Sequence, residues 1–209
     1  MTGIIDYDAG NIKSVEKALK ALGEEAKITR DKDVLLKADR VILPGVGAFG
    51  DAMAKLNAYR LTDIIHEIVS RGTPFLGICL GLQLLFEGSE ESGGVPGLGL
   101  LKGEILRIPD DGGLKIPHIG WNSLSFPHGG RLFAGIEEDS YVYFVHSYYL
   151  KAADERIVTA VTEYGTTIHA SVEAGNLFAC QFHPEKSSGV GLGILKNFLT
   201  VGNETKQIV

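Results

Sequence analysis

Pro74-Phe75-Leu76-Gly77-Ile78-Cys79-Leu80-Gly81-Leu82-Gln83-Leu84-Leu85-Phe86 is the stretch of sequence that decides the fold. Its first half is a short apolar run, and its second half has apolar residues at helical spacing, which predicts a strand, a sharp turn and a helix. Gly77 and Gly81 lie two positions on either side of Cys79. A turn of this kind strains its central residue and leaves room only for small neighbours, so the pattern predicts a nucleophile elbow in which Cys79 is presented and not buried.

The position of Cys79 also predicts its chemistry. The helix is expected to begin at Leu80, and the unpaired N–H groups and dipole at the start of a helix favour the thiolate over the thiol. A buried cysteine in a strand-to-helix turn is the alternative, because free cysteine is among the most buried residue types. The flanking glycines favour a nucleophile.

Strands and helices alternate in the chain before this stretch. Apolar runs at 3–6, 27–29 and 40–43 predict strands, and apolar residues at helical spacing over 12–22 and 53–68 predict helices between them. Such alternation indicates an α/β fold with a mostly parallel open sheet and helices on both faces, as in flavodoxin-like proteins. Ligands bind at the carboxyl ends of the strands in these sheets, which is where the cysteine is expected.

The second half of the chain follows a different pattern. A loop rich in Gly, Ser and Glu covers 87–103, and the runs beyond it are β-branched and aromatic with few helices between them. We therefore expect antiparallel strands attached to the parallel sheet, followed by a closing helix over 189–198. No linker or repeat divides the chain, which predicts one domain over 1–209. The expected strands are 104–108, 141–150, 157–162, 166–172 and 177–182.

Composition limits the class of protein. The 209 residues are 44% hydrophobic and 22% charged, as in ordinary globular domains, and no apolar run approaches the ~20 residues of a membrane span. A formal net charge of −6 argues against nucleic acid as the main partner. The first strand follows Met1-Thr2-Gly3 without a secretory signal ahead of it. We expect a cytoplasmic protein whose two cysteines form no disulfide.

A thiolate nucleophile needs a base and a group that orients the base. Among six histidines, only His183 both follows a buried-looking strand and has a carboxylate close by, in His183-Pro184-Glu185. The proline fixes one backbone torsion between the imidazole and the carboxylate. These residues predict a catalytic triad in the order Cys79, His183, Glu185.

The remaining histidines and the second cysteine have simpler explanations. His66 fits the polar face of a helix and His169 fits a strand, so both are expected to be structural. Cys180 lies among apolar residues and is expected in the core. His118 and His146 lie in Gly-, Pro- or aromatic-rich stretches of the kind that line sites, and they stay candidates.

Metal binding is a competing use of these residue types. The H-x-E arrangement at 183–185 also occurs in zinc deaminases, but those require P-C-x-x-C as well, and no C-x-x-C occurs in this chain. We expect neither a metal nor a cofactor.

The loop from Pro44 to Gly50 is expected to complete the site. An oxyanion that forms at an attacked carbonyl must be met by aimed donors, usually backbone N–H groups. The N–H of Leu80 is one, and glycines at 45 and 47 allow the backbone at Gly47, or at Val46, to offer a second. An ordinary strand-to-helix loop is the alternative. A phosphate loop is disfavoured because the G-x-x-x-x-G-K-[ST] pattern is missing.

With these motifs in place, the chain resembles the triad-type (class I) glutamine amidotransferases. It is similar along nearly its whole length to the glutaminase subunits of imidazole glycerol phosphate synthase in histidine biosynthesis. GICLG and HPE are shared with sister glutaminases, whereas KIPHIGWN and FVHSYY are the narrower signals. The matching stretches are 5–12, 43–53, 77–87, 115–122, 143–149 and 182–187.

The resemblance implies roles for particular residues. Cys79 would attack the side-chain amide of L-glutamine, His183 would protonate the leaving ammonia and Glu185 would orient His183. Gln83 and the segment Ser147-Tyr148 would help to bind glutamine. Ammonia would pass to a separate (β/α)8 cyclase subunit, which uses it to form imidazole glycerol phosphate.

Two other functions stay open on the sequence. One is an enzyme of the same fold with another client, either a γ-glutamyl hydrolase or the glutaminase of another synthase. The other is a binding module that kept the fold and lost the chemistry, which the intact triad disfavours.

The direction that Cys79 faces predicts a partner surface. Ammonia avoids bulk water only if the partner covers the carboxyl ends of the strands. Asn11, in the first strand-to-helix loop, and Lys186, directly after the triad, are therefore expected contacts, with Trp121 as an apolar anchor. The alternative for Lys186 is a solvated surface charge of little energetic weight.

Overall fold

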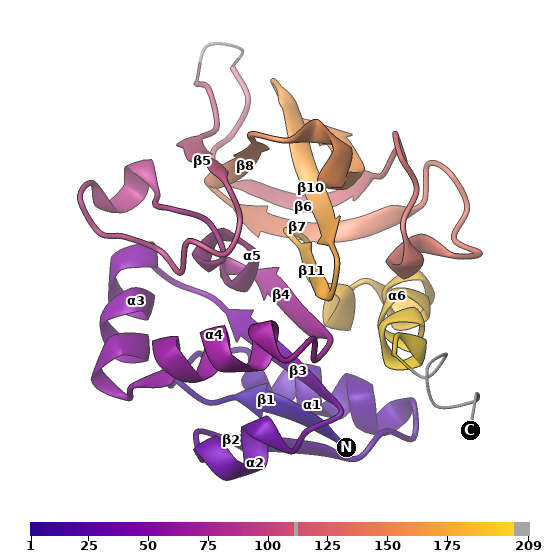
Figure 1. The fold of residues 1–209 in the computed structure, drawn as a ribbon. Helices are drawn as coiled ribbons and strands as arrows, with labels where there is room; N and C mark the ends of the chain where they lie inside the picture. The colour runs from indigo at the N-terminus through magenta and orange to yellow at the C-terminus, as the bar shows by residue number, and fades with distance from the viewer. Residues whose placement is uncertain (111–112, 203–209) are drawn as a thin grey trace.

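The computed structural model describes residues 1–110 and 113–202, and a seven-stranded sheet lies at the centre of these residues (Figure 1). The strand order is β2-β1-β3-β4-β11-β10-β9. The pairs from β2 to β11 are parallel, and β10 and β9 then continue antiparallel. The bounds are β1 Thr2–Ile5, β2 Ala26–Thr29, β3 Arg40–Gly45, β4 Phe75–Cys79, β9 Val158–Glu163, β10 Thr167–Ala174 and β11 Leu177–Cys180.

Helices cover both faces of this sheet, as the apolar periodicity predicts. Helices α2, α3 and α4 bury their apolar sides in one core cluster, whereas α1 and α6 pack into a second cluster with other residues of the sheet. Figure 1 shows α3 and α4 in front of the sheet and α1 behind it. The predicted α/β class is therefore confirmed. The bounds are α1 Ile12–Ala21, α2 Lys32–Leu36, α3 Phe49–Ala58, α4 Leu61–Ser70, α5 Leu80–Leu84 and α6 Ser188–Thr200.

The second half adds two small antiparallel sheets that the sequence resolved only in part. One pairs β5 Gly103–Arg107 with β8 Tyr148–Ala152, and the other pairs β6 His118–Ser123 with β7 Tyr141–His146. The prediction of one strand over 141–150 is wrong, because its halves pair with different partners and separate at Ser147. Strand β6 was not predicted.

The strained turn predicted at the cysteine is present. Cys79 ends β4 with φ 55° and ψ −109°, and α5 begins at the next residue. A Cβ on Gly77 would come within 2.6 Å of the Gly81 carbonyl oxygen, and a Cβ on Gly81 would overlap the Leu43 carbonyl oxygen on β3. The two glycines therefore let α5 begin close against β3 and β4.

We expect Gly81→Ala to lower the free energy of unfolding by at least about 3 kcal/mol, because the new methyl group would press on backbone that cannot move aside. Urea unfolding followed by circular dichroism measures the change. Gly189→Ala is the matched control, since a Cβ there meets open space. Equal stability of Gly81→Ala and the wild type would show that the turn relaxes freely.

Within the part of the chain that is described, the helices are too short or too polar to cross a lipid bilayer.

Candidate active site

A pocket of about 260 Å³ opens over the elbow, and Cys79 lies at its wall. The side chain of Cys79 is only 6% exposed, so the expectation that it stands unburied is wrong: segments distant in sequence cover it. The pocket joins most of the residues predicted for the nucleophile, the oxyanion donors and the glutamine contacts. Its lining is Val46, Gly47, Cys79, Leu80, Gln83, Glu91, Pro117, Val145, His146, Ser147 and Tyr148.

His183 and Glu185 lie behind the pocket in the arrangement of a triad. His183 Nδ1 is 2.8 Å from Glu185 Oε1, and both side chains are fully buried. A carboxylate accepts, so Nδ1 carries the proton. Nε2 is left without a hydrogen-bond partner among the described residues, which makes it the nitrogen available to Cys79 and a leaving group.

The charges around His183 favour its protonated form. Burial lowers the pKa of His183, but the Cys79 sulfur and the Glu185 carboxylate raise it by more, to about 9. An imidazolium therefore persists at neutral pH beside the sulfur. Because the pKa is raised on folding, this contribution to stability is present below pH 6.5 and is lost as the pH rises through about 9.

Gln181 is a site residue that the sequence analysis missed. It is completely buried just after β11, and its Nε2 donates to Cys79 Sγ at 3.7 Å. Its Oε1 accepts from Gln83 Nε2 at 3.0 Å, and the same Gln83 nitrogen donates to the Tyr148 carbonyl. Gln181 and Gln83 together thus link Cys79 to the far wall of the pocket. The local sequence did not indicate a role for Gln181 in the site, because residues 177–182 were expected to form a strand.

His118 and His146 form a buried chain of hydrogen bonds that supports the same wall. His146 Nδ1 lies 2.9 Å from the Tyr148 carbonyl and must donate to it, so His146 Nε2 accepts from His118 Nδ1 at 3.1 Å. Both histidines are on paired strands, and the His118 ring stacks on Phe144 and Tyr164. In this direction the chain requires His146 to be neutral, because protonated His146 has no acceptor to offer His118 Nδ1.

Burial lowers the pKa of His118 to about 4 and that of His146 to about 3. Their contribution to stability is therefore present above pH 6.5 and is lost as the pH falls toward 4. We expect the free energy of unfolding to fall by up to roughly 1.4 kcal/mol per pH unit for each histidine. Urea unfolding at a series of pH values measures the slope, which His118→Phe should reduce. His66→Gln, at an exposed position, should leave the slope unchanged.

The loop after β3 faces the nucleophile from the neighbouring strand. Gly47 has φ +100°, a conformation that favours glycine, and Val46 and Gly47 both line the pocket. Gly45 is needed for a different reason: a Cβ there would meet the Tyr7 hydroxyl and lie 2.9 Å from Leu80 Cβ. The loop can therefore approach Leu80 closely enough to share a ligand oxygen with it.

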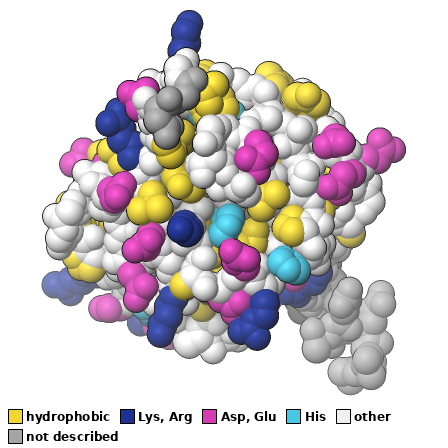
Figure 2. Space-filling model, turned by 90° about the horizontal axis from the view of Figure 1, so that it is seen from above, with side chains coloured by type: hydrophobic (Ala, Val, Ile, Leu, Met, Phe, Trp, Pro, Cys, Tyr) yellow, Lys and Arg dark blue, Asp and Glu magenta, His cyan; other side chains and the backbone are white. Residues whose placement is uncertain are grey.

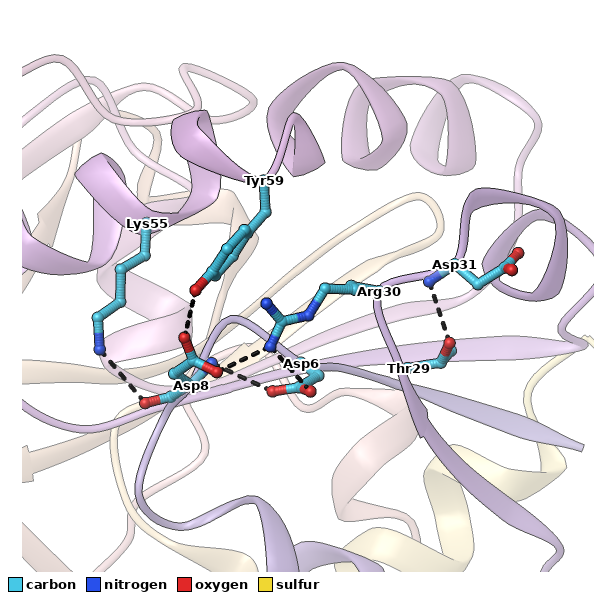
Figure 3. A network of polar contacts seen from close by, with 7 residues as sticks. All are labelled: Asp6, Asp8, Thr29, Arg30, Asp31, Lys55 and Tyr59. Atoms are coloured by element: carbon cyan, nitrogen blue, oxygen red, sulfur yellow. Dashed lines mark hydrogen bonds and ion pairs between the residues drawn. The ribbon is translucent and has the colours of Figure 1, made fainter.

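Asn11 touches the triad directly. It is 6% exposed, its Nδ2 donates to Glu185 Oε1 at 3.2 Å, and its Oδ1 has no partner among the described residues. The loop that carries Asn11 is also held at Asp6 and Asp8. Arg30 donates to both carboxylates, and the Tyr59 hydroxyl donates to Asp8 (Figure 3). The residue expected at a partner surface thus also orients Glu185.

Trp121 and Lys186 belong to one exposed aromatic patch beside the triad. Trp121 is 50% exposed on β6 and meets Tyr143 of β7 edge to face, and Lys186 Nζ lies 6.0 Å from the centre of the Tyr143 ring. Ile119 and Tyr141 on the same strand pair are also exposed. We call these five residues the aromatic patch.

Glu91 is a second site residue that the sequence analysis missed, because the composition of 87–103 predicted only a surface loop. Its Oε2 accepts from the Phe49 N–H at the start of α3, and its carboxylate lines the pocket.

The described residues contain no group of three or more His, Cys, Asp or Glu side chains placed to bind a metal ion. Cys180 is completely buried as predicted, and burial raises the pKa of its thiol.

The chain is similar to known proteins along nearly its whole length. Residues 3–201 match the family described as glutamine amidotransferase class-I. The chain is 55% identical over 195 residues to imidazole glycerol phosphate synthase subunit HisH of Moorella thermoacetica, covering 93% of this chain and 92% of that protein. The subunit of the same description from Bacillus subtilis is 49% identical over 210 residues, with 99% of each chain covered.

Solved structures show the same fold at lower identity. The structure described as PurLQS from Thermotoga maritima has a TM-score of 0.75 at 22% identity and covers 95% of this chain and 97% of its own. A structure described as a glutamine amidotransferase has a TM-score of 0.74, also at 22% identity, covering 95% of this chain and 96% of its own.

Proposed function

Because this chain belongs to the class I glutamine amidotransferases, as a HisH-type glutaminase subunit of imidazole glycerol phosphate synthase in histidine biosynthesis, we propose that it hydrolyses glutamine through Cys79, His183 and Glu185. The observation that carries the assignment is the buried His183–Glu185 pair behind a strained Cys79 at the wall of the pocket.

The first half of the reaction releases ammonia. The Cys79 thiolate attacks the side-chain carbonyl carbon of glutamine, and the carbonyl electrons move to the oxygen. The His183 imidazolium gives the proton on Nε2 to the amide nitrogen, the C–N bond breaks, and ammonia leaves a γ-glutamyl thioester on Cys79. Glu185 holds His183 in the correct tautomer and stabilises its charge throughout.

The second half restores the enzyme. Water attacks the thioester carbonyl while His183 Nε2 takes its proton, and collapse of the intermediate releases glutamate and the thiolate. Both tetrahedral intermediates carry an oxyanion. We assign its donors to the N–H of Leu80, at the start of α5, and to the N–H of Gly47 or Val46 across the pocket.

The pocket offers complementary groups for the rest of glutamine. Ser147 and Tyr148 line the wall opposite the elbow, and Gln83 holds that wall through the Tyr148 carbonyl. The Glu91 carboxylate is the acidic group of the lining, and we assign it to the α-ammonium of glutamine.

We further propose a heterodimer with a (β/α)8 cyclase subunit that receives the ammonia. The aromatic patch supports this, because exposed aromatic side chains and a cation at one place are typical of binding surfaces. Asn11, Trp121 and Lys186 would lie in or beside that interface. We also assign the whole chain, 1–209, to one functional domain, and its compartment to the cytoplasm, where a nucleophilic thiol stays reduced.

Lys186→Ala should weaken binding of the cyclase subunit by about tenfold without unfolding the protein, because a lysine at an aromatic interface loses both its charge and its packing. Calorimetric titration with the cyclase measures the affinity. Lys196→Ala removes an exposed lysine on α6 and serves as the control. Wild-type affinity of Lys186→Ala would make Lys186 an ordinary surface charge.

The experiment that tests the function is ammonia release from glutamine by the chain alone and with the cyclase and its nucleotide ligand. We expect the partner to raise kcat by about 10² to 10³, the effect of aligning one oxyanion donor in the loop of Gly45 to Gly47. Full activity of the isolated chain would rule out this gating, and no activity in either state would refute the assignment.

A further inference from the structure

A second pocket lies on the other side of strand β8 from Cys79. Its volume is about 470 Å³, larger than the 260 Å³ of the pocket at the elbow. Tyr148 lines the first pocket, whereas Tyr149 and Lys151 line the second, since successive residues of a strand face opposite ways. The lining is Pro127, His128, Tyr149, Lys151, Glu155, Val158, Val161, Thr166, Thr167 and His169.

The hydrogen bonds of His169 and His128 determine which ring nitrogen of each is a donor or an acceptor toward the second pocket. His169 Nδ1 accepts from the Ala152 N–H at 3.0 Å, so its proton is on Nε2, which is a donor. His128 Nδ1 lies 3.0 Å from the Val158 carbonyl and donates to it, so neutral His128 presents an acceptor at Nε2. Burial lowers the pKa of His169, which keeps that ring neutral at neutral pH.

Two opposite charges, those of Lys151 and Glu155, complete the lining. Within residues 1–110 and 113–202, neither Lys151 nor Glu155 forms an ion pair within 4.0 Å. The neighbouring cation Arg156 is already committed to Asp154, through contacts of 2.8 Å from both Nε and Nη2. Figure 2 shows histidine, basic, acidic and hydrophobic side chains together near the centre of the upper face of the molecule.

We propose that this second pocket binds a free α-amino acid. The ligand carboxylate lies toward the Lys151 ammonium and the His169 Nε2–H, and its ammonium lies toward the Glu155 carboxylate. Val158, Val161 and Pro127 supply an apolar wall for its side chain. A phosphate dianion fits less well, because one cation is opposed by an anion in the same lining.

Binding at this pocket acts on the wall of the glutamine site. Tyr148, one residue from Tyr149, gives its carbonyl to both Gln83 and His146, so a ligand against Tyr149 and Lys151 restrains the strand that holds those bonds. This coupling rests on the proposed glutaminase function, whereas the binding site does not.

Binding is tested by calorimetric titration of the Cys79→Ala protein with individual L-amino acids. This variant is used because it does not consume glutamine. Concentrations up to about 10 mM are enough to saturate a site with a millimolar Kd. We expect an apolar or aromatic amino acid to bind. Lys151→Met and Glu155→Gln should each weaken binding by about tenfold, the usual effect of losing a hydrogen bond to a charged group. Lys102→Met and Glu104→Gln, exposed positions on and next to β5, are the matched controls.

The ligand itself is varied in the same way. The α-carboxamide and the N-acetyl derivative of the best amino acid each lose one charge and should bind about tenfold more weakly. No binding by any amino acid would overturn the proposal, as would equal binding of acetate or inorganic phosphate. Binding that ignores Lys151→Met and Glu155→Gln would place the ligand in the glutamine pocket and would also overturn it.

The coupling is read in the active complex. The bound amino acid should change the KM for glutamine, and Lys151→Met should remove that change while keeping basal kcat. Unchanged kinetics with proven binding would overturn the coupling. If the enzyme hydrolyses glutamine but no amino acid binds at the second pocket, the proposed binding site is wrong and the glutaminase assignment is unaffected.

Discussion

Replacing Cys79 with alanine is expected to abolish glutamine-dependent synthesis by the complex, with a loss of at least about 10⁴-fold in kcat for ammonia release. The substitution removes the sulfur atom that forms the thioester. Synthesis from added ammonium salts should persist, because only the source of ammonia depends on the thiolate.

Cys180→Ala is the control for loss of a cysteine. Cys180 is completely buried, so its replacement should cost stability while glutamine hydrolysis continues. Glutaminase turnover near the wild-type level in Cys79→Ala would refute the nucleophile. Equal damage from both substitutions, with both proteins folded, would count against the assignment of separate roles.

His183→Ala should be almost as damaging as Cys79→Ala, whereas Glu185→Gln should retain about 10- to 100-fold more activity than His183→Ala. Without His183, no group both protonates the leaving ammonia and activates the water. A glutamine at 185 keeps an oxygen for His183 Nδ1 and Asn11 Nδ2 but lacks the charge. Initial rates of ammonia release in the presence of the cyclase measure both.

The pH profile separates a positioning role of Glu185 from simple damage. The carboxylate helps to raise the pKa of His183, so Glu185→Gln should lower that pKa and move the alkaline limb of kcat to lower pH. A reversed ranking of the two variants, or an unmoved alkaline limb, would contradict the assigned roles.

Local patterns in the sequence determined the strained turn at Cys79 and the class of fold. The spacing of Gly77, Cys79 and Gly81 requires a strained turn, because only glycines allow the backbone to approach so closely. His183 and Glu185 are two positions apart, and a tripeptide limits where their side chains lie. Alternating periodicity predicted the parallel sheet and its helices, since both faces of such a sheet must be covered.

Only the tertiary structure decided which distant residues meet. Asn11 reaches Glu185 across 174 positions, Gln181 reaches Cys79 across 102, and Glu91 enters the pocket from a segment that reads as an exposed loop. The run 141–150 is evenly strand-like, yet it divides at Ser147 between two sheets. Periodicity records which face of an element is apolar, whereas strand order and pairing decide what that face touches. For this reason the strained turn at Cys79 was readable in the sequence, but the burial of Cys79 and its hydrogen bond with Gln181 were not.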